Sequence, residues 1–343
     1  MITAFPPIVA WPVGMIVAAL LGSFLNVCIS RLPRGESIVL PASHCPVCHG
    51  PIRPVDNIPL ISYVALGGRC RVCGVTISWR YPLVEALAVA LGAVVLWQLG
   101  PTWEAVRAFL LCLAMVATAF TDLETRRIPD RITLPGVVAA CILAPEGLAR
   151  GSAGAIVGAA VFAAIAMVRG RRAASRGDSA PPAPSDEEEV DPEELRRLDI
   201  HWAGAWGALI GRQLAVVRVA ALTTPGWPMA FRVLSQIDFV VAGCVVTGGV
   251  FFAVAWVSHA VLGRTGLGGG DIKLAGLIGA ALGASVGLLA AFVGIMLGGV
   301  VATALLLSGR RRFGVYLPFG PFLAAGGVVA AVWGPPIMEW YLG

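Results

Sequence analysis

The sequence predicts an all-α, polytopic helical membrane protein that also carries a small cytoplasmic loop domain. Of the 343 residues, 57% are hydrophobic and only 13% are charged, and the mean hydropathy is +0.83. A soluble domain has about 25% charged residues. Several stretches of about 20 residues carry almost no charge, which is the length that crosses the hydrocarbon layer of a bilayer.

The apolar runs define the candidate membrane spans. They cover roughly residues 8–29, 82–99, 104–121, 132–147, 152–168, 238–263, 272–284, 286–307 and 317–334. The first run has arginines after it and none before it, which reverses the charge order of a cleaved signal peptide. We therefore expect residues 1–29 to form an uncleaved first span with its N-terminus outside. The total is about 8 to 10 transmembrane helices in the lipid bilayer.

The arginines predict which loops face the cytoplasm. The loop at 30–81 carries six arginines against Glu36 and Asp56, and short loops rich in Lys and Arg stay on the cytoplasmic side. Counting crossings from this loop puts Asp122 on the cytoplasmic side as well. Because the basic residues cluster in such loops, the net charge of +5 gives no reason to expect a nucleic-acid partner.

The part of the chain after the first spans has an unusual composition. Spans at 82–168 precede a segment at 169–236, and spans at 237–343 follow it. Residues 169–200 combine basic, Pro/Ala/Ser-rich and acidic stretches, which predicts a disordered cytoplasmic loop. If 132–147, 152–168 and 238–263 are the only spans between them, Asp122 and Asp271 lie on opposite sides of the membrane. Residues 202–222 are therefore a candidate for a further crossing that would place both on the cytoplasmic side. Two arginines make this a poor span, at about 2.5 to 3.5 kcal/mol each, and an interfacial helix is the alternative.

Four cysteines in the cytoplasmic loop have the spacing of a metal site. Cys45 and Cys48 form one Cys-x-x-Cys knuckle, and Cys70 and Cys73 form a second one after 21 intervening residues. Four thiolates at this spacing can surround a structural Zn²⁺ ion tetrahedrally. Two disulfides are the alternative, but the cytoplasm is reducing. The loop is therefore predicted to be a zinc-binding cytoplasmic loop domain, with neighbouring histidines as bystanders.

Two carboxylates border apolar runs at matching depth, Asp122 in TDLETRRIPDR and Asp271 in GLGGGDIKLAG. Intramembrane carboxylates are costly and usually functional. Two neighbouring carboxyl groups cannot both ionise easily, so one can activate water while the protonated one polarises a peptide carbonyl. The glycines before Asp271 would let a substrate backbone approach.

Other interpretations of these acids remain open at this point. Asp271 can cap the following helix or pair with Lys273, and Glu124 and Asp130 compete with Asp122 as acids of the first site. Lys273 can favour an ionised carboxylate or lie at the interface as an anchor. A non-enzymatic transporter or assembly scaffold would also use intramembrane carboxylates, although it would not explain the cysteine loop.

Several motifs resemble those of the bacterial type IV prepilin peptidases. They are GSFLNVCISRLPRGES, CPVC, DNIPLISYVALGGRCRVCG, ISWRYPLVEAL, TDLETRRIPDRITLP, GGGDIKLAGLIGAALG and LPFGPFLAAGG, in family order. The resemblance covers most of the chain outside about 169–236. It implies an inner-membrane aspartic peptidase of the class that includes presenilins, with Asp122 and Asp271 as its catalytic aspartates.

The resemblance also implies substrates and cofactors. Such enzymes remove the short basic leader from type IV prepilins and from type II secretion pseudopilins, on the cytoplasmic side. The four cysteines match the zinc loop of many members. Many members also methylate the new N-terminus with S-adenosylmethionine, so this second activity is implied as well. The acidic block at 186–194 is a candidate receiver for the basic leader.

Overall fold

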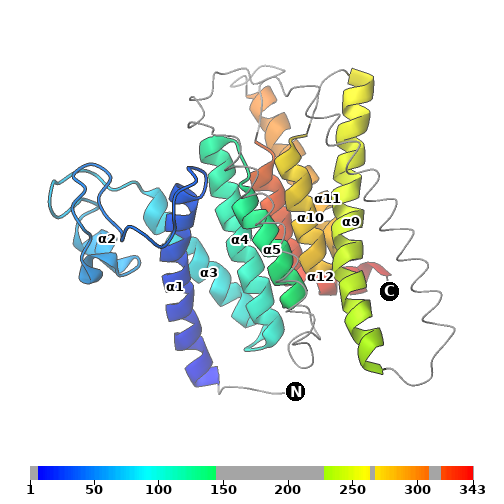
Figure 1. Cartoon of the computed structure of the whole chain (residues 1–343), viewed down its shortest axis with the longest axis horizontal. Helices are drawn as coiled ribbons and strands as arrows, with labels where there is room; N and C mark the ends of the chain where they lie inside the picture. The colour runs from blue at the N-terminus through cyan, green and yellow to red at the C-terminus, as the bar shows by residue number, and fades with distance from the viewer. Residues whose placement is uncertain (1–6, 144–227, 263–266, 309–317, 343) are drawn as a thin grey trace, which may run out of the picture. The chain divides into compact units, whose positions relative to one another are not determined.

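A computed structural model describes residues 7–143, 228–262, 267–308 and 318–342, and all regular secondary structure within them is helical apart from two isolated β-bridges. Figure 1 labels the helices. Their bounds are α1 Pro7–Arg31, η1 Pro54–Asn57, α2 Ile61–Ala65, α3 Arg80–Leu99, α4 Trp103–Thr125, α5 Asp130–Ile142, α9 Pro228–Leu262, α10 Gly269–Leu282, α11 Ala284–Leu307 and α12 Gly320–Leu342. The predicted all-α membrane fold is thereby confirmed.

Five of the described helices are long and apolar enough to cross a membrane, namely α1, α3, α4, α11 and α12. The predicted spans near 132–147 and 272–284 correspond to α5 and α10, which are only 13 and 14 residues long. The predicted span at 238–263 corresponds to the second part of the 35-residue helix α9. The candidate crossings at 152–168 and 202–222 and the acidic block at 186–194 lie outside the described residues.

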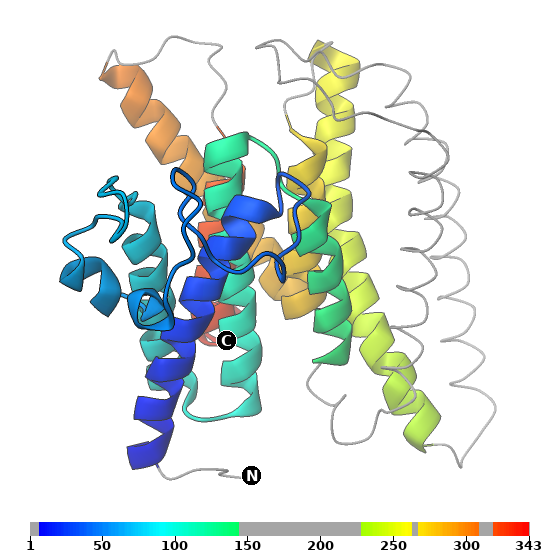
Figure 2. The same ribbon diagram turned by 60° about the vertical axis from the view of Figure 1, so that its left-hand side comes forward.

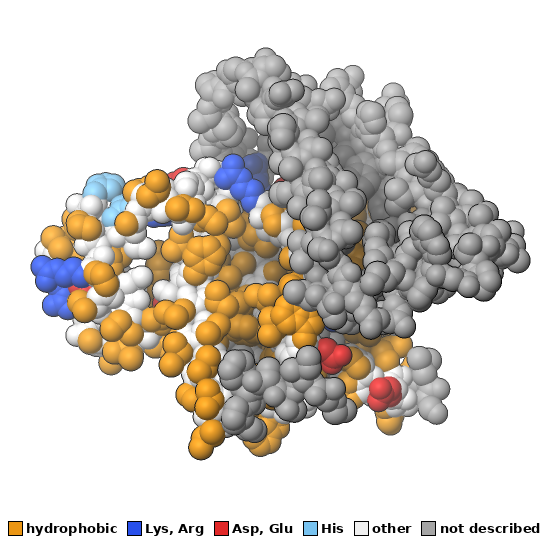
Figure 3. All heavy atoms as spheres, turned by 60° about the horizontal axis from the view of Figure 1, so that its bottom comes forward, with side chains coloured by type: hydrophobic (Ala, Val, Ile, Leu, Met, Phe, Trp, Pro, Cys, Tyr) orange, Lys and Arg blue, Asp and Glu red, His pale blue; other side chains and the backbone are white. Residues whose placement is uncertain are grey.

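The chain divides into two compact units, residues 1–145 with 239–343, and residues 146–238. Apart from the first turns of α9, the helices above belong to the first unit. Its largest core cluster draws buried side chains from α3, α4, α9, α10, α11 and α12, and a second cluster joins α1, α3 and α4. Many large apolar side chains are nevertheless exposed, among them Ile16 at 61% and Val300 at 68%. Hydrophobic side chains accordingly cover much of the coloured surface in Figure 3, as expected of helices that face lipid.

Small residues let the helices pack closely. A Cβ atom at Gly22 of α1 would lie 2.8 Å from Ala88 Cβ on α3, and one at Gly294 of α11 would lie 2.9 Å from Leu323 Cα on α12. Gly279 of α10 meets the backbone of α9 in the same way. Close backbone approach at small residues favours helix association in membranes. Gly279 and Gly294 therefore serve helix packing in this bundle.

Helix α12 runs antiparallel to α4. Gly320, at the start of α12, contacts Asp122 near the end of α4, whereas Gly327 further along α12 contacts Met115 of α4. The N-terminus of α12 therefore lies at the end of the bundle where α4 finishes.

Helix α10 runs parallel to α5. Lys273 pairs with Asp130 at the start of α5, and Leu277 packs on Gly136 further along. The two helices consequently begin at the same end of the bundle, which Figures 1 and 2 both show. The C-terminal end of α4 and the N-termini of α5, α10 and α12 meet there, which brings together motifs that lie about 150 residues apart in the chain.

Candidate functional site

Asp122 lies in the last turn of α4 and is almost completely buried, with an exposed fraction of 4%. Its Oδ2 accepts a hydrogen bond from the Gly320 N–H at 3.1 Å. The helix ends at Arg126, which takes a left-handed conformation with φ 53° and donates its N–H to the Asp122 carbonyl at 2.8 Å. The carboxyl group thus faces the N-terminus of α12, where unpaired N–H groups favour negative charge.

Asp271 is the third residue of α10 and has an exposed fraction of 5%. Its Oδ2 accepts the Gly268 N–H at 3.2 Å, and the Asp271 N–H donates to the Gly268 carbonyl at 3.1 Å. The predicted capping role is therefore correct as local geometry. Capping and chemistry are compatible here because the other carboxylate oxygen is not used by the cap.

The structure brings Asp122 and Asp271 to the same end of the bundle. They are close enough to interact electrostatically, and none of the ion pairs among the described residues includes either of them. Two nearby carboxyl groups in low dielectric resist simultaneous ionisation. This arrangement can take a proton from water at one carboxylate and donate one from the other.

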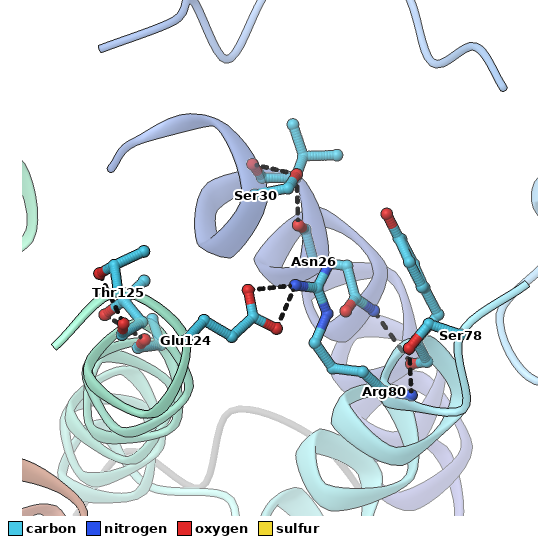
Figure 4. A network of polar contacts seen from close by, with 10 residues as sticks. Asn26, Ser30, Ser78, Arg80, Glu124 and Thr125 are labelled. Carbon is cyan, nitrogen blue, oxygen red and sulfur yellow. Dashed lines mark hydrogen bonds and ion pairs between the residues drawn. The ribbon is translucent and has the colours of Figure 1, made fainter. Parts of the chain in front are cut away.

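The competing acid Glu124 has a different environment. Arg80 Nη1, at the start of α3, lies 2.5 Å from Glu124 Oε1 and 2.6 Å from Oε2. Figure 4 shows this contact beside Asn26, whose amide donates to the Tyr81 carbonyl. The Glu124 side chain is 39% exposed. Glu124 therefore connects α4 to α3 as a paired surface acid.

The second competing acid, Asp130, is also paired. Lys273 Nζ lies 2.6 Å from Asp130 Oδ1, and the two side chains are 44% and 40% exposed. The alternative in which Lys273 pairs with Asp271 is not what the structure has: residues 271 and 273 lie on different faces of α10, and the ammonium group reaches Asp130 of α5 instead. The interpretation of Lys273 as an interfacial anchor missed this partner, because sequence spacing does not show which helix lies beside α10.

The four cysteines of the loop converge. Their Sγ atoms all lie within 4.8 Å of one another, and Cys45 Sγ and Cys73 Sγ are 3.8 Å apart. All four are free thiols. A tetrahedron with Zn–S bonds of about 2.3 Å has edges of about 3.8 Å, whereas a disulfide would need about 2.05 Å. This cluster fits a metal ion and does not form the disulfides considered above.

The two knuckles share one backbone conformation. In the first, the Cys45 N–H donates to Gly50 O and the His49 N–H donates to Cys45 O; in the second, Cys70 and Gly74 do the same, with Val75 as the acceptor. His49 and Gly74 occupy matching positions with positive φ, at 54° and 70°. The sequence thus folds the same metal-binding turn twice.

The turn prepares its first sulfur for a metal. Backbone N–H groups of Cys48 and Val47 point at the Cys45 sulfur and lower its pKa to about 6. The corresponding N–H groups of Cys73 and Val72 lower the pKa of Cys70. Thiolates are the form that binds metal, so the turn favours the ligand state at these two sulfurs. At Cys73 the backbone hydrogen bond is outweighed by burial and the three neighbouring thiols, which raise the pKa to about 11. His44 and His49 stack on each other with ring centroids 6.0 Å apart.

Two polar contacts that the sequence did not indicate hold the loop in place. The buried Glu85 of α3 accepts the Leu60 N–H at 2.7 Å, where Leu60 has a positive φ of 63°. Asp56 and Arg71 form a bidentate pair across the loop, with Nη2–Oδ1 at 2.6 Å, and the hydrogen bonds from Arg71 lower the pKa of Asp56. Such contacts depend on the three-dimensional turn and carry no distinctive sequence spacing.

These features define a polytopic membrane protein with a pair of buried carboxyl groups and a four-cysteine loop. The description "Bacterial Peptidase A24 N-terminal domain" matches residues 16–99, and "Type IV leader peptidase family" matches residues 109–180, which include Asp122. Over these two segments the chain is similar to the type IV leader peptidases. It is a multi-pass inner-membrane protein.

Several relatives extend the match over the chain. A protein from Aeromonas salmonicida (strain A449) is 27% identical over 348 residues, covering 94% of this chain and 90% of the relative. One from Stutzerimonas stutzeri is 28% identical and covers 96% and 92%. One from Myxococcus xanthus (strain DK1622) is 48% identical over 128 residues, or 37% of this chain and 38% of the relative. All three are named prepilin leader peptidase/N-methyltransferase. No solved structure matches this chain.

Proposed function

We propose that the protein is an aspartic peptidase that cleaves the leader peptide from type IV prepilins and type II secretion pseudopilins at the cytoplasmic face of the membrane. Asp122 and Asp271 are the catalytic residues in this proposal. The observation that carries it is the contrast among four acids near one end of the bundle. Asp122 and Asp271 are buried and interact with each other, whereas Glu124 and Asp130 are half-exposed and paired with cations.

The proposed reaction needs only water and the two carboxyl groups. The ionised aspartate removes a proton from water, and the water oxygen attacks the carbonyl carbon of the scissile peptide bond. The protonated aspartate donates its proton toward the carbonyl oxygen. When the tetrahedral intermediate collapses, the C–N bond breaks and the leaving amine takes the proton that came from water, while a hydroxyl group of the intermediate returns its proton to the aspartate that had protonated the carbonyl oxygen. No covalent enzyme intermediate forms, and the pair returns to its one-proton state.

The arrangement of the helices supports this role. Each carboxyl group accepts a backbone N–H, from Gly320 for Asp122 and from Gly268 for Asp271. These bonds orient one oxygen of each group, and the adjacent helix N-termini favour the ionised form of the pair against the cost of burial. A position held by the backbone suits a catalytic group because its geometry is set before the substrate binds.

In the proposed domain division, residues 30–81 form the zinc unit, and the helices on either side of the segment at 169–236 each supply one aspartate. Cys45, Cys48, Cys70 and Cys73 would hold Zn²⁺ with all four positions filled by sulfur. Such a site is structural, because no position is left for water or substrate. The metal would fix the loop against α3, next to the Glu85–Leu60 hydrogen bond.

We extend the proposal to methylation of the new N-terminus with S-adenosylmethionine as the donor. The names of the relatives support this second activity. In the balanced step, the free N-terminal amine attacks the methyl carbon, the C–S bond breaks, and S-adenosylhomocysteine and a proton leave.

Cleavage of a full-length prepilin by purified protein in detergent tests the proposal. We expect the wild type to shorten the prepilin by its leader, and Asp122→Asn and Asp271→Asn each to abolish the shift while remaining folded by thermal scan. The product mass in the presence of S-adenosylmethionine tests methylation, with a gain of one methyl group expected.

The competing transporter or scaffold function makes the opposite prediction. A wild-type protein that processes none of several prepilins would favour it. Cleavage by both aspartate variants would show that the reaction uses other groups.

A further inference from the structure

The turn between α4 and α5 lies directly alongside the start of α10. It begins four residues after Asp122, at the left-handed Arg126, and ends where Asp130 starts α5. The facing segment of α10 contains Asp271. The turn therefore lies close to both aspartates, although they are far apart in the sequence.

Two contacts join the turn to α10. A Cβ atom at Gly270 would lie 3.0 Å from Ile128 Cβ, so Ile128 packs directly on the backbone next to Asp271. Lys273 Nζ lies 2.6 Å from Asp130 Oδ1. One contact is apolar and one is ionic, and they lie on either side of Asp271 in the α10 sequence.

The direction of Lys273 separates it from the reaction itself. Two residues along a helix turn a side chain by about 200°, so Lys273 points away from the Asp271 carboxyl group. The face of α10 that carries Lys273 continues to Leu277, which packs on Gly136 of α5. This face is therefore the contact between two short parallel helices, whereas Asp271 faces the region of Asp122.

We propose that Asp130 and Lys273 are positioning residues, whose ion pair fixes the start of α5 against α10 and thereby sets the separation of the Asp122 and Asp271 carboxyl groups. The expected effect on kcat rests on the proposed peptidase function. The effect of the ion pair on the positions of α5 and α10 does not depend on that function. Neither residue touches the substrate in this proposal. Both act by holding the α4–α5 turn and α10 in register.

The physical reason lies in the shortness of the two helices. With 13 and 14 residues, α5 and α10 share little length over which packing can fix their relative shift. An ion pair between their first turns resists a shift of α5 along α10, at the end of the helices that lies nearest the two aspartates. Misplacing catalytic groups by about 1 Å costs on the order of 100-fold in rate, so a modest link can have a large kinetic effect.

Prepilin cleavage by Asp130→Asn, Lys273→Met and the double variant tests the proposal. Each single variant should lower kcat by about 10-fold to 100-fold with little change in KM, because substrate binding is untouched. The double variant should lose less than the product of the two single losses, since both single variants remove the same ion pair. Lys273→Arg keeps the charge and should retain most of the activity.

Two kinetic outcomes would overturn the proposal. Losses that multiply in the double variant would mean that Asp130 and Lys273 act separately, for example on the substrate. Wild-type kinetics in both single variants would mean that the pair positions nothing. Asp56→Asn is the matched control, because it breaks another ion pair with a 2.6 Å N–O distance that lies in the cysteine loop. It should leave kcat unchanged.

Hydrogen–deuterium exchange of the same purified variants gives a readout that does not depend on peptidase activity. Peptides that cover residues 126–134 and 269–277 should exchange faster in both single variants, and Lys273→Arg should restore protection. Unchanged exchange would overturn the structural link even if the protein proved not to be a peptidase. Faster exchange together with a complete lack of prepilin cleavage by wild type would instead support the link and contradict the proposed function.

Discussion

The contact between Gly320 and Asp122 makes Gly320→Ala the most informative single substitution. A Cβ atom at residue 320 would lie 2.6 Å from Asp122 Oδ2 and 3.0 Å from its Cγ. Ordinary contact begins at 3.4 Å, so the carboxyl group would have to move by roughly 0.8 Å. The same movement would stretch the hydrogen bond from the Gly320 N–H, which is 3.1 Å long in the structure.

The magnitude follows from the sensitivity of catalysis to position. A displacement near 1 Å costs on the order of 100-fold, so we expect kcat for prepilin cleavage to fall by roughly 30-fold to 100-fold. KM should change little, because the substrate does not need residue 320 to bind. The assay is a time course of leader removal at several prepilin concentrations, using purified protein in detergent.

The control is the same substitution in open surroundings. A Cβ atom at Gly299 of α11 would meet nothing within 4 Å, so Gly299→Ala should behave as wild type. A thermal scan of both variants separates loss of fold from loss of rate. Wild-type kinetics for Gly320→Ala would refute the reasoning, because a catalytic carboxyl group cannot tolerate that displacement.

Three further predictions concern the metal loop, the paired acid and the helix packing. Cys73→Ser should lower the zinc content measured by atomic absorption from about one per chain toward zero, whereas Cys112→Ser, in α4, should leave it unchanged; equal zinc in both would contradict the four-cysteine site. Glu124→Gln should keep prepilin cleavage, because this acid pairs with Arg80 at the surface, and should cost less than about 1 kcal/mol in thermal stability; loss of cleavage would return Glu124 to the catalytic candidates. Gly294→Ala should destabilise the protein by about 1 to 3 kcal/mol, seen as a lower Tm in detergent, because its methyl group would lie 2.9 Å from backbone on α12; an unchanged Tm would show that α11 and α12 separate easily.

Much of the fold and site follows from local patterns. Apolar runs of about 20 residues predict helices, because a segment in lipid must make its backbone hydrogen bonds within itself. Helices α1, α3, α4, α11 and α12 lie where such runs occur. The cysteine spacing predicts that the four sulfur atoms come together, since each Cys-x-x-Cys turn presents two sulfurs that can bind the same metal ion. Asp122 and Asp271 were proposed from their places at the ends of apolar runs.

The remaining features depend on which helices are neighbours. Nothing in the spacing of Asp130 and Lys273 indicates that α5 runs parallel to α10, so their pairing was not predicted. The contact of Glu85 with Leu60 was missed for a related reason, because the backbone N–H that donates to a buried carboxylate can lie anywhere in a loop. Which backbone each packing glycine meets is likewise a property of the assembled bundle.

The cysteine loop is joined to the helical bundle at two neighbouring points. It leaves the bundle at the end of α1 and returns at the start of α3, and these helices are antiparallel neighbours joined by the bond from Asn26 Nδ2 to Tyr81 O at 3.0 Å. Since the two attachment points lie side by side, a segment of any length can be inserted or removed there without moving the helices. The loop can therefore be replaced without changing how the helices pack. A protein in which a short Gly-Ser linker replaces it should still assemble the helical bundle, and evolution could vary the loop independently of the aspartate pair.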